Sequence, residues 1–356
     1  MGWFTRTAAL TKLALEPQVE AWVDRSLLYP VDVTGVVSPG VLGRDAAMRV
    51  PAVARARHLI AGTIAGLPLR ALRGAELVEP QPSWAYLSDG QLGDSTEAER
   101  ARLGLLVPQS PWYRMLWTVD DLLFYGLSCW YATALDPDGR PLRLARIPYA
   151  LWDIDEDTAQ VIDVDGRPLD PGRVKLIPGS HSGLLDFGRD TIRQAASLER
   201  VAADVAAHPF RLELHQTTDV ALTPTERAEL ITAAREALAV NDGIIWTNSA
   251  VETKDHALDS GELLVGGRNA SALDVARHAS IPAAMLDATT AGASLEYATL
   301  QGRNQQWIDY GLVIYMDPVE ARLGMDDVTP SGQRVAFDTA DLTAPAAAAT
   351  GPVTED

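Results

Sequence analysis

Two alanine-rich stretches constrain the architecture of this 356-residue chain more than any other feature. Residues 190–208, DTIRQAASLERVAADVAAH, predict a long helix that Pro209 closes. A second alanine-rich helix is expected to begin after Gly266-Gly267, with Asn269 as its cap. Small side chains let helices approach one another closely. The residues between the two helices are expected to form a small insertion.

This intervening segment carries its own helix start signal. Thr223 stands at the N-cap, Pro224 at the first helical position, and Glu226 where it closes a capping box. The helix is expected to stop at Asn241-Asp-Gly, and short strands are expected within residues 243–255. The pattern predicts a small α/β insertion.

The N-terminal half predicts an α+β body. Helical spacing is present in residues 49–66 and in residues 112–125, where Gly126 ends the helix. Residues 127–135 and 141–147 are expected to pair as strands across a turn, with the single cysteine, Cys129, as an inert buried thiol. At this length the chain can form two or more cores.

Residues 282–297, PAAMLDATTAGASLEY, are small and almost chargeless. Gly292 permits a positive φ, and small side chains have little rotamer entropy to lose. A loop of this kind suits a lid over an active site, an inert surface loop, or a finger inside a channel.

After this loop, helical spacing resumes in residues 295–316. Asp317-Pro318 is expected to start one further short helix that ends at Gly324. The last stretch, residues 339–356, has no apolar period and is predicted to be a disordered tail.

The charge balance of 30 basic and 48 acidic residues gives a formal charge of −18. This excess argues against a protein that grips nucleic acid by its phosphates, although it is compatible with DNA that passes without sticking. No apolar run approaches the ~20 residues needed to cross a bilayer, so no membrane partner is expected.

Recognisable catalytic and metal motifs are missing from the sequence. It has no P-loop and no dinucleotide-binding glycine fingerprint. In Gly179-Ser-His-Ser-Gly183, His181 stands where a hydrolase would need its nucleophilic serine, which favours a turn.

The acidic run 153–157 offers three calcium-ligand positions, but Thr158 and Val164 stand where glycine and glutamate are required. The six histidines show no metal-site spacing, and His208 is expected to interact with the end of its helix. We therefore expect no enzyme activity, no metal and no cofactor.

A set of motifs in a particular order resembles the portal proteins of tailed bacteriophages, the HK97-like portal family, over residues 45–325. The motifs are Ile64-Ala-Gly-Leu-Pro-Leu69, Asp121-Leu-Leu-Phe-Tyr-Gly126, Trp130-Tyr131, Asp136-Pro-Asp-Gly-Arg140, Leu144 to Pro148, Ile281-Pro282 with Met285-Leu286, Ser294-Leu-Glu296, and Pro318 to Leu323.

The resemblance implies a portal fold whose crown is reduced or absent. Its implied parts are an N-terminal arm (1–19), an α/β wing (20–186), a stem helix (187–208), a small α/β clip (209–262), a second stem helix (263–286), a tunnel loop (287–295), a long helix returning to the wing (296–325), and a short, partly disordered C-terminal segment (326–356).

The same resemblance implies a homo-oligomeric ring, expected to be dodecameric, at the portal vertex of the virion capsid. The ring would be made in the bacterial host cytoplasm and would serve as a non-enzymatic conduit for double-stranded DNA during packaging and ejection. Its implied partners are the major capsid protein, the terminase large subunit, which would hydrolyse the ATP, and head–tail connector or adaptor proteins.

The implied channel-facing residues of the tunnel loop are Thr289, Thr290, Gly292 and Ser294. In the clip, the residues expected to support the intersubunit and partner surface are Thr223 and Glu226, by helix capping, and Ile244, Ile245 and Trp246, by packing.

Two alternatives remain open at this point. One is a soluble hydrolase-like α+β enzyme with residues 287–295 as its lid. The other is a different ring-forming head–tail adaptor. The alanine-rich helices would pack between adjacent subunits in a ring, or against each other inside a monomer.

Overall fold

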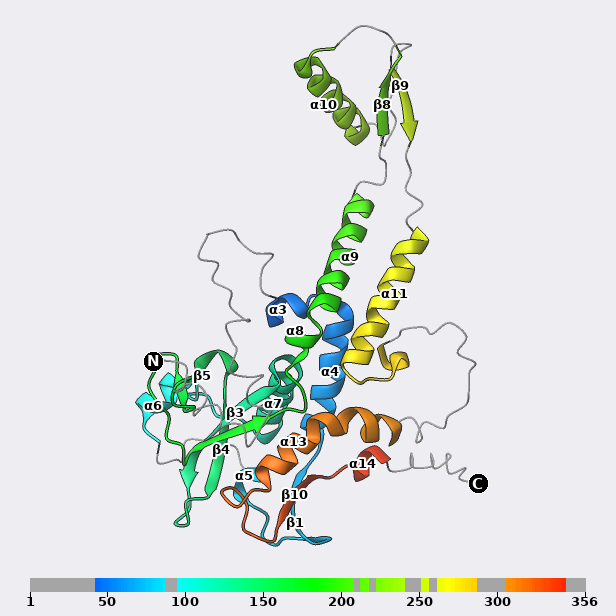
Figure 1. Ribbon diagram of the computed structural model, residues 1–356. Helices are drawn as coiled ribbons and strands as arrows, with labels where there is room; N and C mark the ends of the chain where they lie inside the picture. Colours follow the sequence, from blue (N-terminus) through cyan, green and yellow to red (C-terminus); the bar gives the residue numbers. More distant parts are fainter. Residues whose placement is uncertain are drawn as a thin grey trace, which may run out of the picture. The chain divides into compact units, whose positions relative to one another are not determined.

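The computed structural model describes residues 42–86, 95–207, 212–217, 222–240, 251–255, 261–286 and 305–343. The chain divides into two compact units. Unit one comprises residues 1–196 and 269–356, and unit two comprises residues 197–268. Helices α9 (Arg189–Ala207) and α11 (Gly261–His278) each contribute residues to both units (Figure 1).

The helices of unit one are α3 (Arg44–Ala47), α4 (Pro51–Gly66), α5 (Ser83–Tyr86), α6 (Glu97–Arg102), α7 (Pro111–Tyr125), α8 (Leu184–Phe187), α13 (Val313–Leu323) and α14 (Ala340–Thr343). Short 3-10 turns, η2 (Tyr149–Leu151) and η3 (Ala283–Leu286), and a π-helix, η4 (Ile308–Leu312), accompany them. Its strands are β1 (Leu69–Arg73), β2 (Glu76–Leu77), β3 (Leu127–Leu135), β4 (Pro141–Ile147), β5 (Trp152–Ile154), β6 (Val161–Asp163), β7 (Val174–Pro178) and β10 (Arg334–Phe337).

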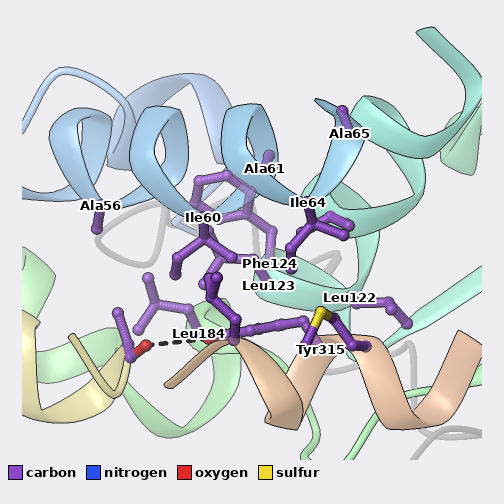
Figure 2. Packing of buried hydrophobic residues seen from close by; sticks show 14 of the residues in the cluster. Ala56, Ile60, Ala61, Ile64, Ala65, Leu122, Leu123, Phe124, Leu184 and Tyr315 are labelled. Carbon is purple, nitrogen blue, oxygen red and sulfur yellow. Dashed lines mark hydrogen bonds between the residues drawn. The ribbon is translucent and has the colours of Figure 1, made fainter. Parts of the chain in front are cut away.

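Helices α4 and α7 form the centre of the main core, as their apolar spacing predicts. Ser110 caps α7 by accepting a hydrogen bond from the Tyr113 backbone N–H, and Gly126 ends the helix in the left-handed conformation (φ 71°). Ile60 and Ile64 of α4 point toward the α7 residues Leu122 to Phe124 (Figure 2). This packing fixes the direction in which the chain enters β3.

Strand β3 is the central strand of the sheet β4-β3-β7 and pairs antiparallel with both neighbours. Leu127, Cys129 and Tyr131 enter a second core beside Trp152, whereas Trp130 enters the main core. Because alternate side chains point to opposite faces, a strand between two cores is buried on both. The predicted strand pair and the buried thiol are confirmed.

Strand β10 completes a second sheet, β10-β1-β2, and was not predicted. Leu69 of β1 pairs with Phe337, and Val335 and Phe337 are buried in the main core. Helix α14 follows within the stretch that we predicted to be disordered from residue 339. A four-residue strand whose partner lies more than 260 residues earlier leaves no periodic signal in the sequence.

Helix α11 differs from its predicted bounds at both ends. It begins at Gly261, so Gly266-Gly267 and Asn269 lie inside the helix and Asn269 is not its cap. Within unit two, a Cβ built on Gly267 lies 3.5 Å from a Leu198 methyl group, and Arg268 donates to Glu199 at 2.8 Å. Glycine inside a helix costs about 1 kcal/mol per residue, and a Cβ on Gly266 would meet no atom within 4 Å.

The C-terminal end of α11 is at His278, eight residues before the end of the stem part (263–286) that the resemblance implies. Ser280 then takes a positive φ of 54°, and Pro282 follows. A left-handed residue followed by proline cannot continue a helix. Residues 283–286 form the separate turn η3.

Pro318 lies inside α13 and does not start a new helix, which contradicts our prediction. Proline has no N–H to donate to the carbonyl four residues earlier. That carbonyl, Ile314 O, instead accepts a hydrogen bond from Ser180 Oγ at 2.9 Å. A residue distant in sequence thus satisfies the group that proline would leave unpaired, and α13 continues to Leu323.

Unit two contains the antiparallel pair β8 (Leu212–Gln216) and β9 (Val251–Asp255) and helix α10 (Pro224–Val240). The predicted capping box is present. The Thr223 backbone N–H donates to Glu226 Oε2 at 2.8 Å, and the Glu226 N–H donates to Thr223 Oγ1 at 3.3 Å. Ile244, Ile245, Trp246 and His208 lie outside the described residues.

Removing this cap should weaken α10. Thr223→Ala is expected to destabilise the helix by about 1 kcal/mol, because one backbone donor loses its acceptor. Hydrogen bonds from Thr223 hold the pKa of Glu226 below its ordinary value. The part of the cap that uses the Glu226 carboxylate should therefore be present at neutral pH and lost as the pH falls through that lowered pKa, whereas the bond from the Glu226 N–H to Thr223 Oγ1 does not titrate. Amide hydrogen exchange of α10 measures both effects, and equal exchange in the two proteins at pH 7 would contradict the cap.

None of the helices in the described ranges combines the length and the apolar character that crossing a membrane requires.

Candidate functional site

The candidate functional site is the base of segment 287–304, which contains the predicted tunnel loop. Thr289, Thr290, Gly292 and Ser294 lie outside the described residues. The structure does describe the chain on either side, which consists of η3 before the segment and the helix from residue 305 after it.

The chain just before η3 contacts the chain that follows the segment. A Cβ built on Gly311 of η4 would lie 2.6 Å from the Ser280 carbonyl oxygen, so only glycine allows this approach. Tyr315 donates its hydroxyl to the Ala279 carbonyl at 3.4 Å, and its ring lies among the core side chains drawn in Figure 2. The described chain before the segment therefore contacts the described chain after it, at Ser280 and Gly311.

Apolar packing fixes this base in the main core. Ile281 and Leu286 are buried on the side that precedes the segment, and Trp307, Ile308 and Leu312 on the side that follows it. Arg55 of α4 also donates to the Met285 carbonyl at 3.5 Å. The ends of the segment are thus held by the same core that holds α4 and α7.

The π-helix η4 was not predicted, because residues 295–316 show ordinary helical spacing. A π-helix places an extra residue in one turn and often marks a functional position. Here it coincides with Gly311, whose backbone approaches Ser280 O and the Trp307 ring. The glycine inside an apolar helix was the available signal in the sequence.

The chain that follows the segment exposes polar side chains. Tyr310 is 74% exposed, and Gln305 donates to Asp309 at 2.7 Å. Residues 305–321 contain no lysine or arginine. Residues 305–321 therefore offer no cation to a phosphate backbone, whereas Arg55 of α4 is an exposed cation at the base.

The stretch Gly179 to Gly183 is a structural turn. Burial lowers the pKa of His181, whose Nδ1 accepts the Gly183 backbone N–H at 3.1 Å. Its ring packs edge-on against Phe187 and Tyr315. His181 therefore has a packing role, and the stretch does not have the geometry of a nucleophile elbow.

The acidic run 153–157 is a hairpin between β5 and β6. Asp155 Oδ1 accepts the backbone N–H groups of Asp157 and Thr158, and the hydrogen bonds with Thr158 lower the Asp155 pKa. This carboxylate stabilises a turn. Across the ranges that the structure describes, no three His, Cys, Asp or Glu side chains gather as a metal site.

A buried ion pair explains the start of the Asp121-Leu-Leu-Phe-Tyr-Gly126 motif and was missed in the sequence. The Asp121 carboxylate accepts both Nε (2.7 Å) and Nη2 of Arg146 and also the Ser128 hydroxyl (2.7 Å). Asp121 is fully buried and Arg146 is 9% exposed. The bond network joins α7 to β3 and β4.

The neighbouring Asp120 binds two further arginines. Arg44 donates from Nε and Nη2 at 2.7 and 2.8 Å, and Arg57 donates from Nε. The guanidinium groups of Arg44, Arg57 and Arg146 all lie within 5.5 Å of the Trp117 ring. Cations over an indole face are favourable. Two adjacent aspartates in an apolar helix were the sequence signal for this cluster.

A crystal structure of an HK97 family phage portal protein from Corynebacterium diphtheriae is 31% identical to this chain. The match covers 85% of this chain and 97% of that one, with a TM-score of 0.68. This chain belongs to the HK97 family of phage portal proteins. The predicted α+β class is confirmed, since the chain combines helices and sheets in a fold that matches a portal protein.

Two more distant solved structures share the fold. The neck of the native GTA particle, computed with C12 symmetry, is 14% identical over 83% of this chain and 84% of that one, with a TM-score of 0.52. The neck of the empty GTA particle, computed with C6 symmetry, is 13% identical over 88% and 89%, with a TM-score of 0.50. No family model matches the chain, and a search of curated proteins finds no match.

Proposed function

We propose that the chain is a non-catalytic portal subunit, one of about twelve that form a ring at one capsid vertex and conduct DNA. Membership of the HK97 portal family supports the ring, and the shared fold of a GTA neck computed with C12 symmetry supports twelve subunits. The ring would dock the terminase large subunit during filling and head–tail connectors afterwards, and it would contact the major capsid protein.

The observation that carries this proposal is the anchored base of segment 287–304. Gly311 approaches Ser280 closely, and apolar residues on both sides of the segment are buried in the main core. Residues 287–302 contain no lysine or arginine. Arg303, close to the end of the segment, is its one basic residue. A segment with anchored flanks and a stretch of 16 residues without a cation is suited to lie beside passing DNA without trapping its phosphates.

Family membership also supports an assignment of the remaining parts. Residues 20–186 form the wing, α9 and α11 the stem, and residues 209–262 the clip. The capped helix α10 has an exposed face that includes Leu230 and Ile231, which supports a role of the clip in contacts with other subunits or partners.

Shortening the segment tests the channel role. Deletion of residues 289–293 is expected to leave the ring intact and to reduce DNA packaging strongly, because the ends at η3 and residue 305 are held by the core and the lost residues face the DNA. The mass of the purified protein in solution, together with negative-stain images, measures the ring. A DNA packaging assay with the same variant measures the conduit.

A matched control keeps the length and removes only two methyl groups, by Thr289→Ser with Thr290→Ser. This control should package DNA as the natural sequence does. Normal packaging by the deletion variant would contradict the tunnel-loop assignment. A strict monomer in the presence of capsid partners would contradict the ring itself.

A further inference from the structure

We propose that an exposed apolar surface of unit one is the docking site of this chain's own N-terminal segment, residues 1–41. The surface consists of Leu106, Val107, Trp112 and Tyr113 and is named the 106–113 surface. The proposed contact does not depend on the channel role.

The 106–113 surface concentrates large apolar side chains within eight positions. Leu106 is 59% exposed, Val107 75%, Trp112 50% and Tyr113 47%. Single exposed apolar residues are ordinary on a protein surface, whereas a cluster with two aromatic rings marks an interaction site. Aromatic side chains provide a large contact area when they are covered.

The neighbouring residues hold this surface in place. Gln109 is buried, donates from Nε2 to the Arg146 carbonyl at 2.8 Å, and accepts the Arg146 N–H at 2.9 Å. Leu105 is buried in the second core, and Ser110 caps α7. The backbone between residues 105 and 111 is therefore anchored, and its apolar side chains point outward from a fixed frame.

The described chain begins close to this surface. Leu42 is buried in the main core, and Arg44 lies over the Trp117 ring, 5.0 Å from its centroid. The Trp117 ring in turn contacts the Tyr113 ring, with centroids 6.2 Å apart. Because Tyr113 and Trp117 are one helical turn apart, the described chain begins about one turn from the surface.

Arg44 also fixes this starting point. Its bidentate bond to Asp120 ties α3 to α7, and Asp120 is 1% exposed. An extended chain covers roughly 3.3 Å per residue, so a few residues before Leu42 suffice to reach Tyr113.

The composition of residues 1–41 matches an apolar surface. Of these 41 residues, 21 are hydrophobic and seven are charged. Aromatic residues occur at Trp3, Phe4, Trp22 and Tyr29, and five valines lie within residues 31–41. By contrast, residues 87–94, LSDGQLGD, offer only two apolar side chains and two aspartates to cover the same site. The N-terminal segment is therefore the better occupant.

Photo-cross-linking tests the occupant directly. A photoreactive amino acid replaces Val107 in the full-length protein, and mass spectrometry locates the linked peptide after irradiation. We expect links to residues 1–41 in a product that migrates as one chain in denaturing electrophoresis. Val164, an exposed valine of unit one at 61%, is the matched control and should not link to residues 1–41.

Two outcomes would overturn the proposal. Links from position 107 to residues 87–94 or to any part of the folded body would identify another occupant. A product with twice the mass of the chain would show that a second copy covers the surface.

Hydrogen exchange provides an independent measurement on a folded variant. Val107→Asp with Tyr113→Asp changes two exposed side chains, so unit one should stay folded. Release of the segment should speed the exchange of its amides by about tenfold, the ratio that corresponds to 1.4 kcal/mol. Val164→Asp should leave this exchange unchanged. Equal exchange in the double variant and the natural sequence would refute the docking.

Discussion

Gly126→Ala is expected to destabilise unit one by roughly 3 kcal/mol, through conformational strain and a backbone collision together. Gly126 has a φ of 71°, and a non-glycine residue in this region costs roughly 1–2 kcal/mol. A Cβ at this position would lie 2.1 Å from the His181 carbonyl oxygen and 2.7 Å from the Ser182 carbonyl carbon. Both are backbone atoms, so no side-chain rotation relieves the overlap, and overpacking adds roughly 1–3 kcal/mol.

The residue on the other side of this contact, Gly183, is constrained in the same way. Gly183 has a φ of 95°, and a Cβ there would lie 2.4 Å from the Phe124 carbonyl oxygen. The end of α7 and the turn before α8 thus approach each other through two glycines. A change at either glycine should move the turn that supports α13 through Ser180.

Gly139→Ala is the matched control for this prediction. Gly139 has a φ of 79°, but a Cβ there meets no atom within 4 Å. It should lose only the conformational part, roughly 1–2 kcal/mol. Urea denaturation of both variants separates the two contributions. Equal losses would show that the contact between the backbones of residues 126 and 181–183 is relieved at no cost.

Asp121→Ala is expected to cost roughly 3–5 kcal/mol, because it leaves Arg146 buried without its carboxylate. The arginine would lose two hydrogen bonds and the Ser128 hydroxyl would lose its acceptor. The loss should appear in the unfolding of unit one, where this network joins α7 to β3 and β4.

A second variant separates the loss of the Asp121–Arg146 ion pair from the cost of burying the Arg146 charge without a partner. Asp121→Leu with Arg146→Met replaces both charges by apolar groups, and such replacements are often neutral or stabilising. The double variant should therefore recover most of the stability that Asp121→Ala loses. Asp274→Ala breaks an exposed pair with Arg277 and should change the stability by less than about 1 kcal/mol. A double variant as unstable as Asp121→Ala would show that the network is needed for more than charge pairing.

Features set by neighbouring residues were predictable before the structure was known. The strands 127–135 and 141–147, the end of α7 at Gly126 and the capping box at Thr223 all depend on contacts within a few positions. The order of these local motifs also indicated the portal family, which the 31% identity confirms. The residues assigned to the channel and most of those assigned to the clip remain predictions.

Contacts between distant residues decided the rest. Pairing of β10 with β1, the Asp121–Arg146 bond and the Ser180 hydroxyl that lets α13 continue through Pro318 each join residues far apart in the chain. The π-helix at Gly311 exists where Ser280 approaches from another element. Local composition records how a backbone prefers to turn or extend. Which buried group meets which partner depends on how the elements pack, and the packing brings together residues that no short stretch of sequence contains.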